Sequence, residues 1–240
     1  FLKRLSIYMQ DKRALLTEHL EELRNRIIKS LIFVIIASCL VYSSIGKILP
    51  HLVKPVGKLV FLAPQEAFLT NIKLAFFLGL FLALPFVLYH IWRFVSSGLK
   101  PRERKYCLIF GPFSFIFFLL GSSFGYFLIV PIGMGFLLEF ANEYLVPMLS
   151  ISKYVSFVGT LTFAFGLVFQ LPLVLLFLTK IGVVTPRFLS SHRKHAIVII
   201  FIVSASLTPP DVVTQVLMAV PLILLYELGL IFSKFAYRRE

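Results

Sequence analysis

The chain has 240 residues, of which 59% are hydrophobic and 15% are charged, and its formal net charge is +13. An ordinary soluble domain carries about 25% charged and about 45–50% apolar residues. This composition therefore excludes a soluble globular domain and indicates an all-α integral membrane protein. The basic residues lie between apolar segments rather than among aromatic residues on one face, which favours membrane orientation over nucleic-acid binding.

The N-terminal part of the chain, residues 1–26, is polar and basic. Its leucines recur at helical spacing, and Thr17 is a suitable N-cap residue with acidic residues in the turn that follows. The pattern predicts an amphipathic helix on the cytoplasmic membrane surface that runs into a first span at residues 27–45. The loop that follows, residues 46–68, is rich in Leu and Val and is predicted to contain a short surface helix.

Three further spans are predicted at residues 69–95, 108–138 and 154–179. Proline within the second span is expected to kink it. The third carries Gly121 and Gly125, whose four-residue spacing permits close helix approach. In the fourth, Gln170 is the least expected residue, and its amide either bonds a neighbouring helix or makes a functional polar contact.

The last two apolar segments, residues 196–207 and 212–226, have about 12 and 15 uncharged residues, whereas a full span needs about 20. They are predicted to cross a locally thinned bilayer or to form a re-entrant hairpin. Asp211, in the turn between them, either caps the last helix or shapes a polar floor on the far side with Gln215. Glu227 is expected to pair with a base of the tail.

The distribution of Lys and Arg predicts the orientation. With six spans and both termini in the cytoplasm, nineteen of the 24 basic residues lie on the cytoplasmic side and five on the other. This excess on the inner side follows the positive-inside rule. The chain is thus predicted to be one membrane domain: the cytoplasmic segment 1–26, a six-helix bundle at 27–232 and a basic cytoplasmic tail at 233–240.

The loop at residues 99–106 places one acid, Glu103, among four bases. A carboxylate in this setting can hold a guanidinium through two parallel hydrogen bonds. The alternative is that Glu103 is only a counter-charge in a loop that sets topology. The motifs of phosphate-binding loops, zinc proteases and serine hydrolases are absent from the sequence, and no metal-ligand spacing occurs.

Five short stretches carry a family resemblance: His-Leu-Glu-Glu-Leu-Arg-Asn-Arg (19–26), Leu-Tyr-His-Ile-Trp-Arg-Phe (88–94), Lys-Pro-Arg-Glu-Arg-Lys (100–105), Ala-Phe-Gly-Leu-Val-Phe-Gln-Leu-Pro (164–172) and Thr-Pro-Pro-Asp-Val-Val-Thr-Gln (208–215). Their order and spacing make the chain, over roughly residues 15–235, resemble TatC, the multispanning subunit of the twin-arginine protein translocase.

The resemblance implies a cup of six helices, the last two short, in the cell inner membrane, or in a thylakoid or other organellar membrane of a eukaryote. It implies binding of twin-arginine signal peptides of folded precursors, and export driven by the proton-motive force. The implied partners are TatA-like and TatB-like single-span proteins and other copies of the chain. No enzymatic activity, cofactor or nucleic acid is expected.

Residue by residue, the resemblance places signal-peptide binding at Glu103, Phe94, Glu22, Leu23 and Arg24, and a far-side loop at Pro209, Asp211 and Gln215. Where the family commonly has an acid, this chain has Gln170, which can hydrogen-bond a partner helix but cannot form an ion pair. The alternative function is a small secondary transporter whose short helices surround a midplane site. The lack of a repeat or a charged pair in mid-membrane disfavours that alternative.

Overall fold

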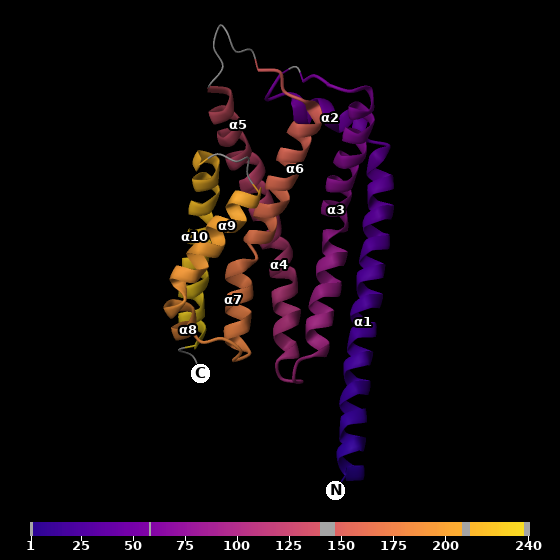
Figure 1. Ribbon diagram of the computed structural model, residues 1–240, viewed down its shortest axis with the longest axis vertical. Coiled ribbons are helices and arrows are strands. Elements are labelled where there is room, and N and C mark those ends of the chain that lie inside the picture. The colour runs from indigo at the N-terminus through magenta and orange to yellow at the C-terminus, as the bar shows by residue number, and fades with distance from the viewer. Residues whose placement is uncertain (1, 58, 140–146, 208–211, 238–240) are drawn as a thin grey trace.

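The computed structural model describes residues 2–57, 59–139, 147–207 and 212–237, with side chains from residue 17 onward. Within these ranges the regular elements are helices, and strand pairing is limited to one isolated bridge between Val60 and Ser150. The long helices stand side by side (Figure 1), and many of their large apolar side chains are exposed. Such a surface is the one that contact with lipid requires, because helices satisfy their backbone polar groups internally.

The first helix, α1, spans Leu2–Tyr42 without a break. The expected helix start at Thr17 and the expected orientation along the membrane surface are therefore wrong. The first half of α1 continues straight in line with the second and projects beyond the neighbouring helices (Figure 1). The physical reason is that the sequence has no Gly or Pro before Gly46, so nothing ends or bends the helix.

The predicted short helix after the first span is present as α2, Ile45–Val53. It is followed by α3, Pro64–Ser97, which begins five residues before the predicted span because Pro64 occupies the first turn, where its missing N–H costs nothing. Helix α3 packs along α1 so closely that Gly79 has no room for a side chain against Ser38.

The third span is a continuous series of α4 (Arg104–Phe124), the π-helical turn η1 (Gly125–Ile129) and α5 (Val130–Glu139). The π turn was not predicted. Within it the Val130 N–H donates to the Gly125 carbonyl, five residues earlier. Pro131 follows directly and has no N–H to donate, which makes an irregular turn at this point easier to accommodate.

The predicted fourth span is divided into α6 (Ile151–Val168) and α7 (Leu171–Lys180). The break comes at Phe169 and Gln170 because Pro172, in the first turn of α7, cannot donate to the carbonyl of Val168. The predicted fourth span is thus confirmed as a candidate membrane span at Ile151–Lys180, and the break within it was not predicted.

Helix α6 forms the centre of the core and contacts α4 at very short range. A Cβ atom added at Gly121 would lie 2.5 Å from the Phe165 carbonyl oxygen, and one at Gly125 would lie 3.0 Å from the Phe165 Cβ. Phe165 itself is fully buried. The predicted close approach at the two glycines is thus confirmed.

Three helices complete the described chain: α8 (Pro186–Ser191), α9 (Arg193–Leu207) and α10 (Val212–Tyr237). The fifth apolar segment is short, as predicted, at 15 residues. The sixth is not, because α10 has 26 residues and continues past the predicted end at residue 226. In the described residues, five helices or continuous series of helices are long and apolar enough to cross a membrane. Helix α9 is not one of them.

Glu227 of α10 pairs with a base of the neighbouring helix. Its Oε2 accepts a hydrogen bond from Arg193 Nη2 at 2.9 Å, which ties α10 to the start of α9. In the described residues the partner is thus Arg193 and not Lys234 of the tail, while the tail bases Arg238 and Arg239 lie outside the described residues. At the other end of the hairpin, Gln215 Nε2 donates to the Phe201 carbonyl at 3.2 Å. Pro209 and Asp211 lie outside the described residues.

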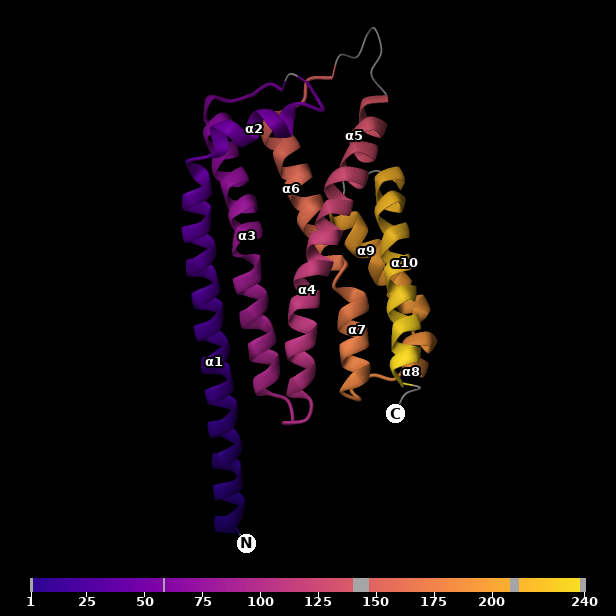
Figure 2. The same cartoon turned by 180° about the vertical axis from the view of Figure 1, so that it is seen from behind.

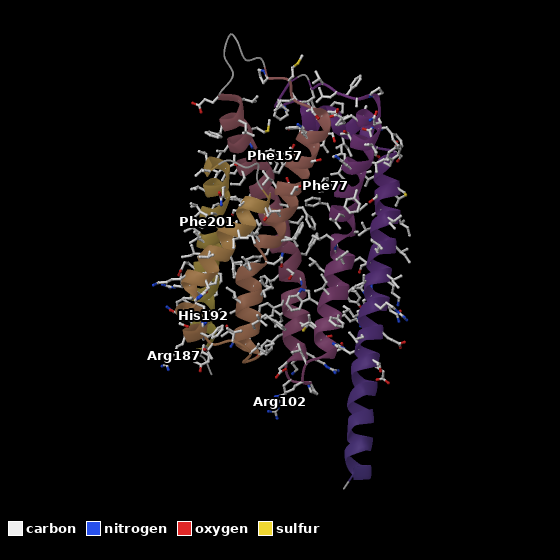
Figure 3. The ribbon with its side chains drawn as sticks, in the orientation of Figure 1. Phe77, Arg102, Phe157, Arg187, His192 and Phe201 are labelled. Atoms are coloured by element: carbon white, nitrogen blue, oxygen red, sulfur yellow. The ribbon has the colours of Figure 1, made fainter. Side chains whose placement is uncertain are left out.

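The arrangement of the helix ends positions the candidate site. The start of α1, the α3–α4 loop, α8 and the end of α10 lie at one end of the molecule (Figures 1 and 2), and α2 and the start of α6 lie at the other. Arg102 and Arg187 project from the first end (Figure 3). We call it the basic end, because it carries the segments with most of the Lys and Arg residues.

Candidate functional site

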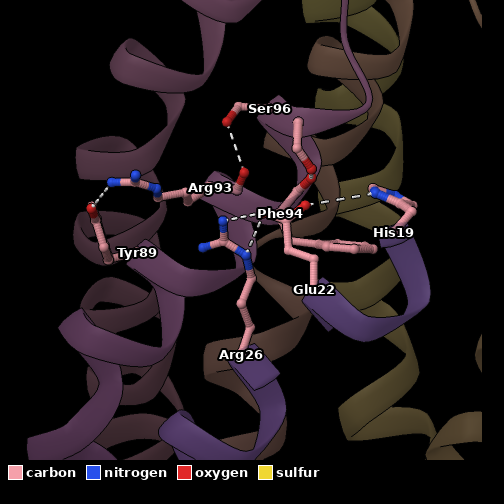
Figure 4. Close-up of polar contacts among 8 residues, drawn as sticks. His19, Glu22, Arg26, Tyr89, Arg93, Phe94 and Ser96 are labelled. Carbon is pink, nitrogen blue, oxygen red and sulfur yellow. Dashed lines mark hydrogen bonds and ion pairs between the residues drawn. The ribbon is translucent and has the colours of Figure 1, made fainter. Parts of the chain in front are cut away.

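At the basic end, α1 presents one polar face to α3. His19, Glu22 and Arg26 follow one another at spacings of three and four residues, which places them on the same side of a helix. The His19 ring stacks on Phe94 of α3, with ring centroids 4.5 Å apart and an interplanar angle of 18°. This stack fixes α1 against the end of α3 (Figure 4).

The Glu22 carboxylate is held by its own helix. Arg26 donates to Glu22 Oε1 from Nε, at 3.0 Å, and also from Nη2. Glu22 Oε2 lies 3.8 Å from His19 Nδ1. Both partners of the Glu22–Arg26 pair are partly exposed, with side-chain exposures of 32% and 16%. Glu22 is therefore an oriented carboxylate with one oxygen directed away from Arg26.

Arg93 extends the polar face on α3. Its Nη1 donates to the Tyr89 hydroxyl oxygen at 2.6 Å, and its backbone carbonyl accepts from Ser96 Oγ at 2.8 Å (Figure 4). The Tyr89 contact holds the Arg93 guanidinium one turn back along α3, whereas the Ser96 contact involves only the Arg93 backbone. Sequence analysis did not assign a role to Arg26, Tyr89 or Arg93, although the four-residue spacing of Glu22 and Arg26 is the signal of an ion pair on a helix.

Glu103 is half-buried in the turn between α3 and α4. Its Oε2 accepts a hydrogen bond from the Lys100 N–H at 3.1 Å, and its own N–H donates to the Lys100 carbonyl at 2.9 Å. In the described part of the chain, no hydrogen bond or ion pair joins Glu103 to α1. The carboxylate closes its own turn and keeps the second oxygen for another donor.

The structure brings only some of the predicted binding residues together. Glu22 and Phe94 meet through His19, and Glu103 lies in the adjoining loop. Leu23 is half-buried, whereas Arg24 is exposed. Because a helix has about 3.6 residues per turn, Arg24 lies on the side of α1 opposite to Glu22.

Two adjoining pockets open beside these residues. The smaller, of 480 Å³, lies between α1 and α3 and is lined by Glu18, Glu21, Glu22, Asn25, Arg26, Lys29, Tyr89, His90 and Arg93. The larger, of 910 Å³, lies over α3 between α1 and α4. The two share Glu22, Arg26, Tyr89 and Arg93, so Glu22 stands at the point where they join. Glu103 is not among the residues that line either pocket.

Gln170 lies deeper in the bundle, at the break between α6 and α7. Its Nε2 donates to the Ser114 carbonyl of α4 at 2.8 Å, and the Ser114 hydroxyl accepts from Trp92 Nε1 at 2.8 Å. Of the two roles open to this amide, the structure shows the bond to a neighbouring helix. That bond links the broken helix to α4 and, through Ser114, to α3.

Comparison with known proteins agrees with this architecture. The family model "Sec-independent protein translocase protein (TatC)" matches residues 18–221. The chain is 44% identical to a TatC protein of Carboxydothermus hydrogenoformans, over 97% of this chain and 98% of the relative. It is 40% identical to a TatC protein of Aquifex aeolicus, over 94% of this chain and 97% of the relative.

A crystal structure of a twin arginine translocase receptor, TatC, matches the fold with a TM-score of 0.83 and 39% sequence identity, covering 91% of this chain and 99% of that chain. This match confirms the predicted all-helical membrane fold, and a secondary transporter is not supported. The family model, the relatives and the solved structure agree over most of the chain. The chain is therefore a multi-pass membrane protein that belongs to the TatC family of Sec-independent protein translocase proteins.

Proposed function

We propose that the protein is the receptor subunit of a twin-arginine translocase and that it binds the arginine pair of a signal peptide at the basic end. The observation that carries this proposal is the position of the Glu22 carboxylate, which is oriented, partly exposed and located where the two pockets join. A guanidinium matches a carboxylate in shape and charge, and the pair forms strong charge-assisted hydrogen bonds.

Glu22 and Glu103 each receive one arginine of the signal peptide in this proposal. Both carboxylates already use one oxygen within the protein, Glu22 for Arg26 and Glu103 for the Lys100 N–H. The Lys100 N–H fixes the Glu103 carboxylate before the peptide arrives, which lowers the entropy cost of binding. The weak Arg26 pair of Glu22 gives way to the incoming arginine. Phe94 supports the site because its stack on His19 fixes the helix that carries Glu22. Leu23 and Arg24 border it.

The orientation and the assembly are part of the same proposal. Six spans with both termini in the cytoplasm place the basic end inside, in agreement with the excess of Lys and Arg there. The short α9 then crosses thinned bilayer as the fifth span. TatA-like and TatB-like single-span proteins and further copies of this chain are the partners, with Gln170 as a polar contact for a partner helix. The proton-motive force drives export.

The test is a binding measurement on the purified protein in lipid nanodiscs. A signal peptide with its arginine pair is compared with the same peptide carrying two lysines. Lysine keeps the charge but loses the planar fork, so we expect its affinity to fall by about tenfold or more. Equal affinity for the two peptides would mean that the basic end attracts positive charge without recognising guanidinium groups, and the proposal would be wrong.

A further inference from the structure

The larger pocket has features that binding of an arginine pair does not require. We call it the α3–α4 groove, and its floor and walls are formed largely by Leu88, Trp92, Leu108, Gly111 and Phe115. Leu108 is 79% exposed. A Cβ atom added at Gly111 would be 3.8 Å from the Trp92 ring, so the missing side chain widens the groove. The groove is an apolar channel that is open toward the surrounding hydrocarbon.

The mouth of the groove is charged, in contrast to its apolar floor. Arg93, Arg104 and Lys105 line it, together with the mutually paired Glu22 and Arg26. Arg93 uses Nη1 for Tyr89, and Arg104 makes one long contact of 3.4 Å from Nε to the Leu99 carbonyl. Within the described residues, the remaining N–H groups of the two guanidiniums and the Lys105 ammonium make no hydrogen bond, so the mouth carries an excess of positive charge.

We propose that the α3–α4 groove binds an anionic phospholipid, with its phosphate at Arg93, Arg104 and Lys105 and an acyl chain along the apolar floor. Basic pockets between membrane helices on the cytoplasmic side bind the head groups of anionic lipids. The phosphate accepts hydrogen bonds from the guanidinium and ammonium groups, and the acyl chain packs against Leu88 and Phe115.

The length of the groove supports a lipid. From Arg104 to Phe115 the α4 helix rises about 16 Å, at about 1.5 Å per residue, which is close to half of the roughly 30 Å hydrocarbon core. The groove therefore reaches the depth of a single leaflet. Its volume of 910 Å³ lies within the range of about 300–1,000 Å³ that is usual for small-molecule sites.

The charge of the groove favours an anionic phospholipid over a signal peptide as its occupant. The arginine pair is cationic, so Arg93, Arg104 and Lys105 at the mouth repel it and attract a phosphate. The smaller pocket is lined by as many acids as bases, so it does not repel the arginine pair in this way. A free phosphate would satisfy the bases but leave the apolar channel unused. The larger pocket, with its excess of bases and its apolar floor, is thus the one suited to an anionic lipid.

The test is titration of the delipidated, purified protein with phosphatidylglycerol and with phosphatidylcholine of the same acyl chains, followed by native mass spectrometry. We expect phosphatidylglycerol to bind more tightly. Replacement of both bases in the variant Arg104→Gln/Lys105→Gln should weaken its binding by about 25-fold, about fivefold for each charge. Phosphatidylcholine binding should stay within twofold of the wild type. Glycerol 1-phosphate, which lacks acyl chains, should not compete.

Arg102→Gln is the matched control, because Arg102 belongs to the same loop but is not among the residues that line the groove and projects away from the bundle (Figure 3). The Arg102→Gln variant should bind both lipids with the affinity of the wild type. A second variant, Gly111→Leu, fills the channel and should weaken both lipids. Size-exclusion profiles establish that each variant is folded.

Three results would overturn the proposal. The first is equal affinity for the two lipids in the wild type. The second is an equal loss in Arg102→Gln, which would show a general charge effect. The third is that Gly111→Leu abolishes binding of the arginine-pair peptide and leaves the lipids unchanged, since the groove would then belong to the apolar segment of the peptide.

Discussion

Arg26 of α1 donates from Nε and Nη2 to the same oxygen of Glu22, one helical turn earlier. A guanidinium is therefore already in contact with the carboxylate that we propose as a receptor for a signal-peptide arginine. Partly exposed pairs of this spacing contribute only about 0.3–0.5 kcal/mol. The internal pair therefore orients Glu22, and an incoming arginine loses little binding free energy when it displaces Arg26.

Replacement of Arg26 by Gln removes this competitor. We expect Arg26→Gln to bind the arginine-pair peptide about twofold more tightly, because the weak internal pair no longer has to be shared. Isothermal titration calorimetry measures the change. Arg187→Gln, which removes an exposed charge at the same end, is the control and should bind like the wild type. Weaker binding in Arg26→Gln would show instead that Arg26 mainly positions Glu22.

The contact of α4 with α6 leaves no room for a methyl group at Gly121. Gly121→Ala should lower the free energy of unfolding by about 1–3 kcal/mol, the usual cost of overpacking. Thermal unfolding in detergent measures this as a drop in Tm. Gly135→Ala is the matched control, since Gly135 is also helical but has open space where a Cβ would stand. Similar Tm values for the two variants would contradict the observed packing.

Trp92 is the only tryptophan in the chain, so its fluorescence reports directly on the bond to Ser114. Ser114→Ala leaves a partly buried indole N–H without its acceptor, and should cost about 1–3 kcal/mol of stability and shift the Trp92 emission. Ser123→Ala changes an exposed serine of the same helix and should alter neither quantity. An unchanged spectrum in Ser114→Ala would mean that the Trp92 contact is not maintained in solution.

Much of the fold could be predicted because the bilayer imposes simple rules. Apolar length located the long spans, and the spacing of Gly121 and Gly125 predicted a close helix contact, which the structure shows with α6. The orientation that the charge counts indicate stays a prediction. The errors came from local backbone events. A single proline, Pro172, divides the fourth span, and the absence of any helix breaker before Gly46 keeps α1 straight through Thr17.

The candidate site was less accessible to sequence reasoning, because it depends on contacts between residues far apart in the chain. The motifs indicated Glu22, Phe94 and Glu103 individually, but no pattern could show that His19 joins the first two by stacking. The long α10 was missed for the same reason. A charge at Glu227 ends an apolar window in the sequence, but it does not end the helix, and Glu227 pairs with Arg193 of α9.

Six spans predict that the connection between α5 and α6 faces the side opposite to the basic end. In a Cys39→Ser background, which removes the exposed native cysteine, an impermeant thiol reagent applied from outside should label Met148→Cys and miss Arg187→Cys. Met148 is 75% exposed, whereas Ser150 is buried by its contact with Glu66 and is unsuitable for labelling. The reverse labelling pattern would contradict the topology.

The most direct measurement of the central claim is binding of the arginine-pair peptide to Glu22→Gln and Glu103→Gln, together with their abundance in the membrane. Each change keeps the shape of the side chain and its internal acceptor but removes the charge. We expect normal abundance and an affinity loss of about ten- to hundredfold for each variant, since a charge-assisted hydrogen bond contributes about 1.5–3 kcal/mol. Wild-type affinity at normal abundance in both variants would contradict the account and leave Glu103 as a counter-charge in a topogenic loop.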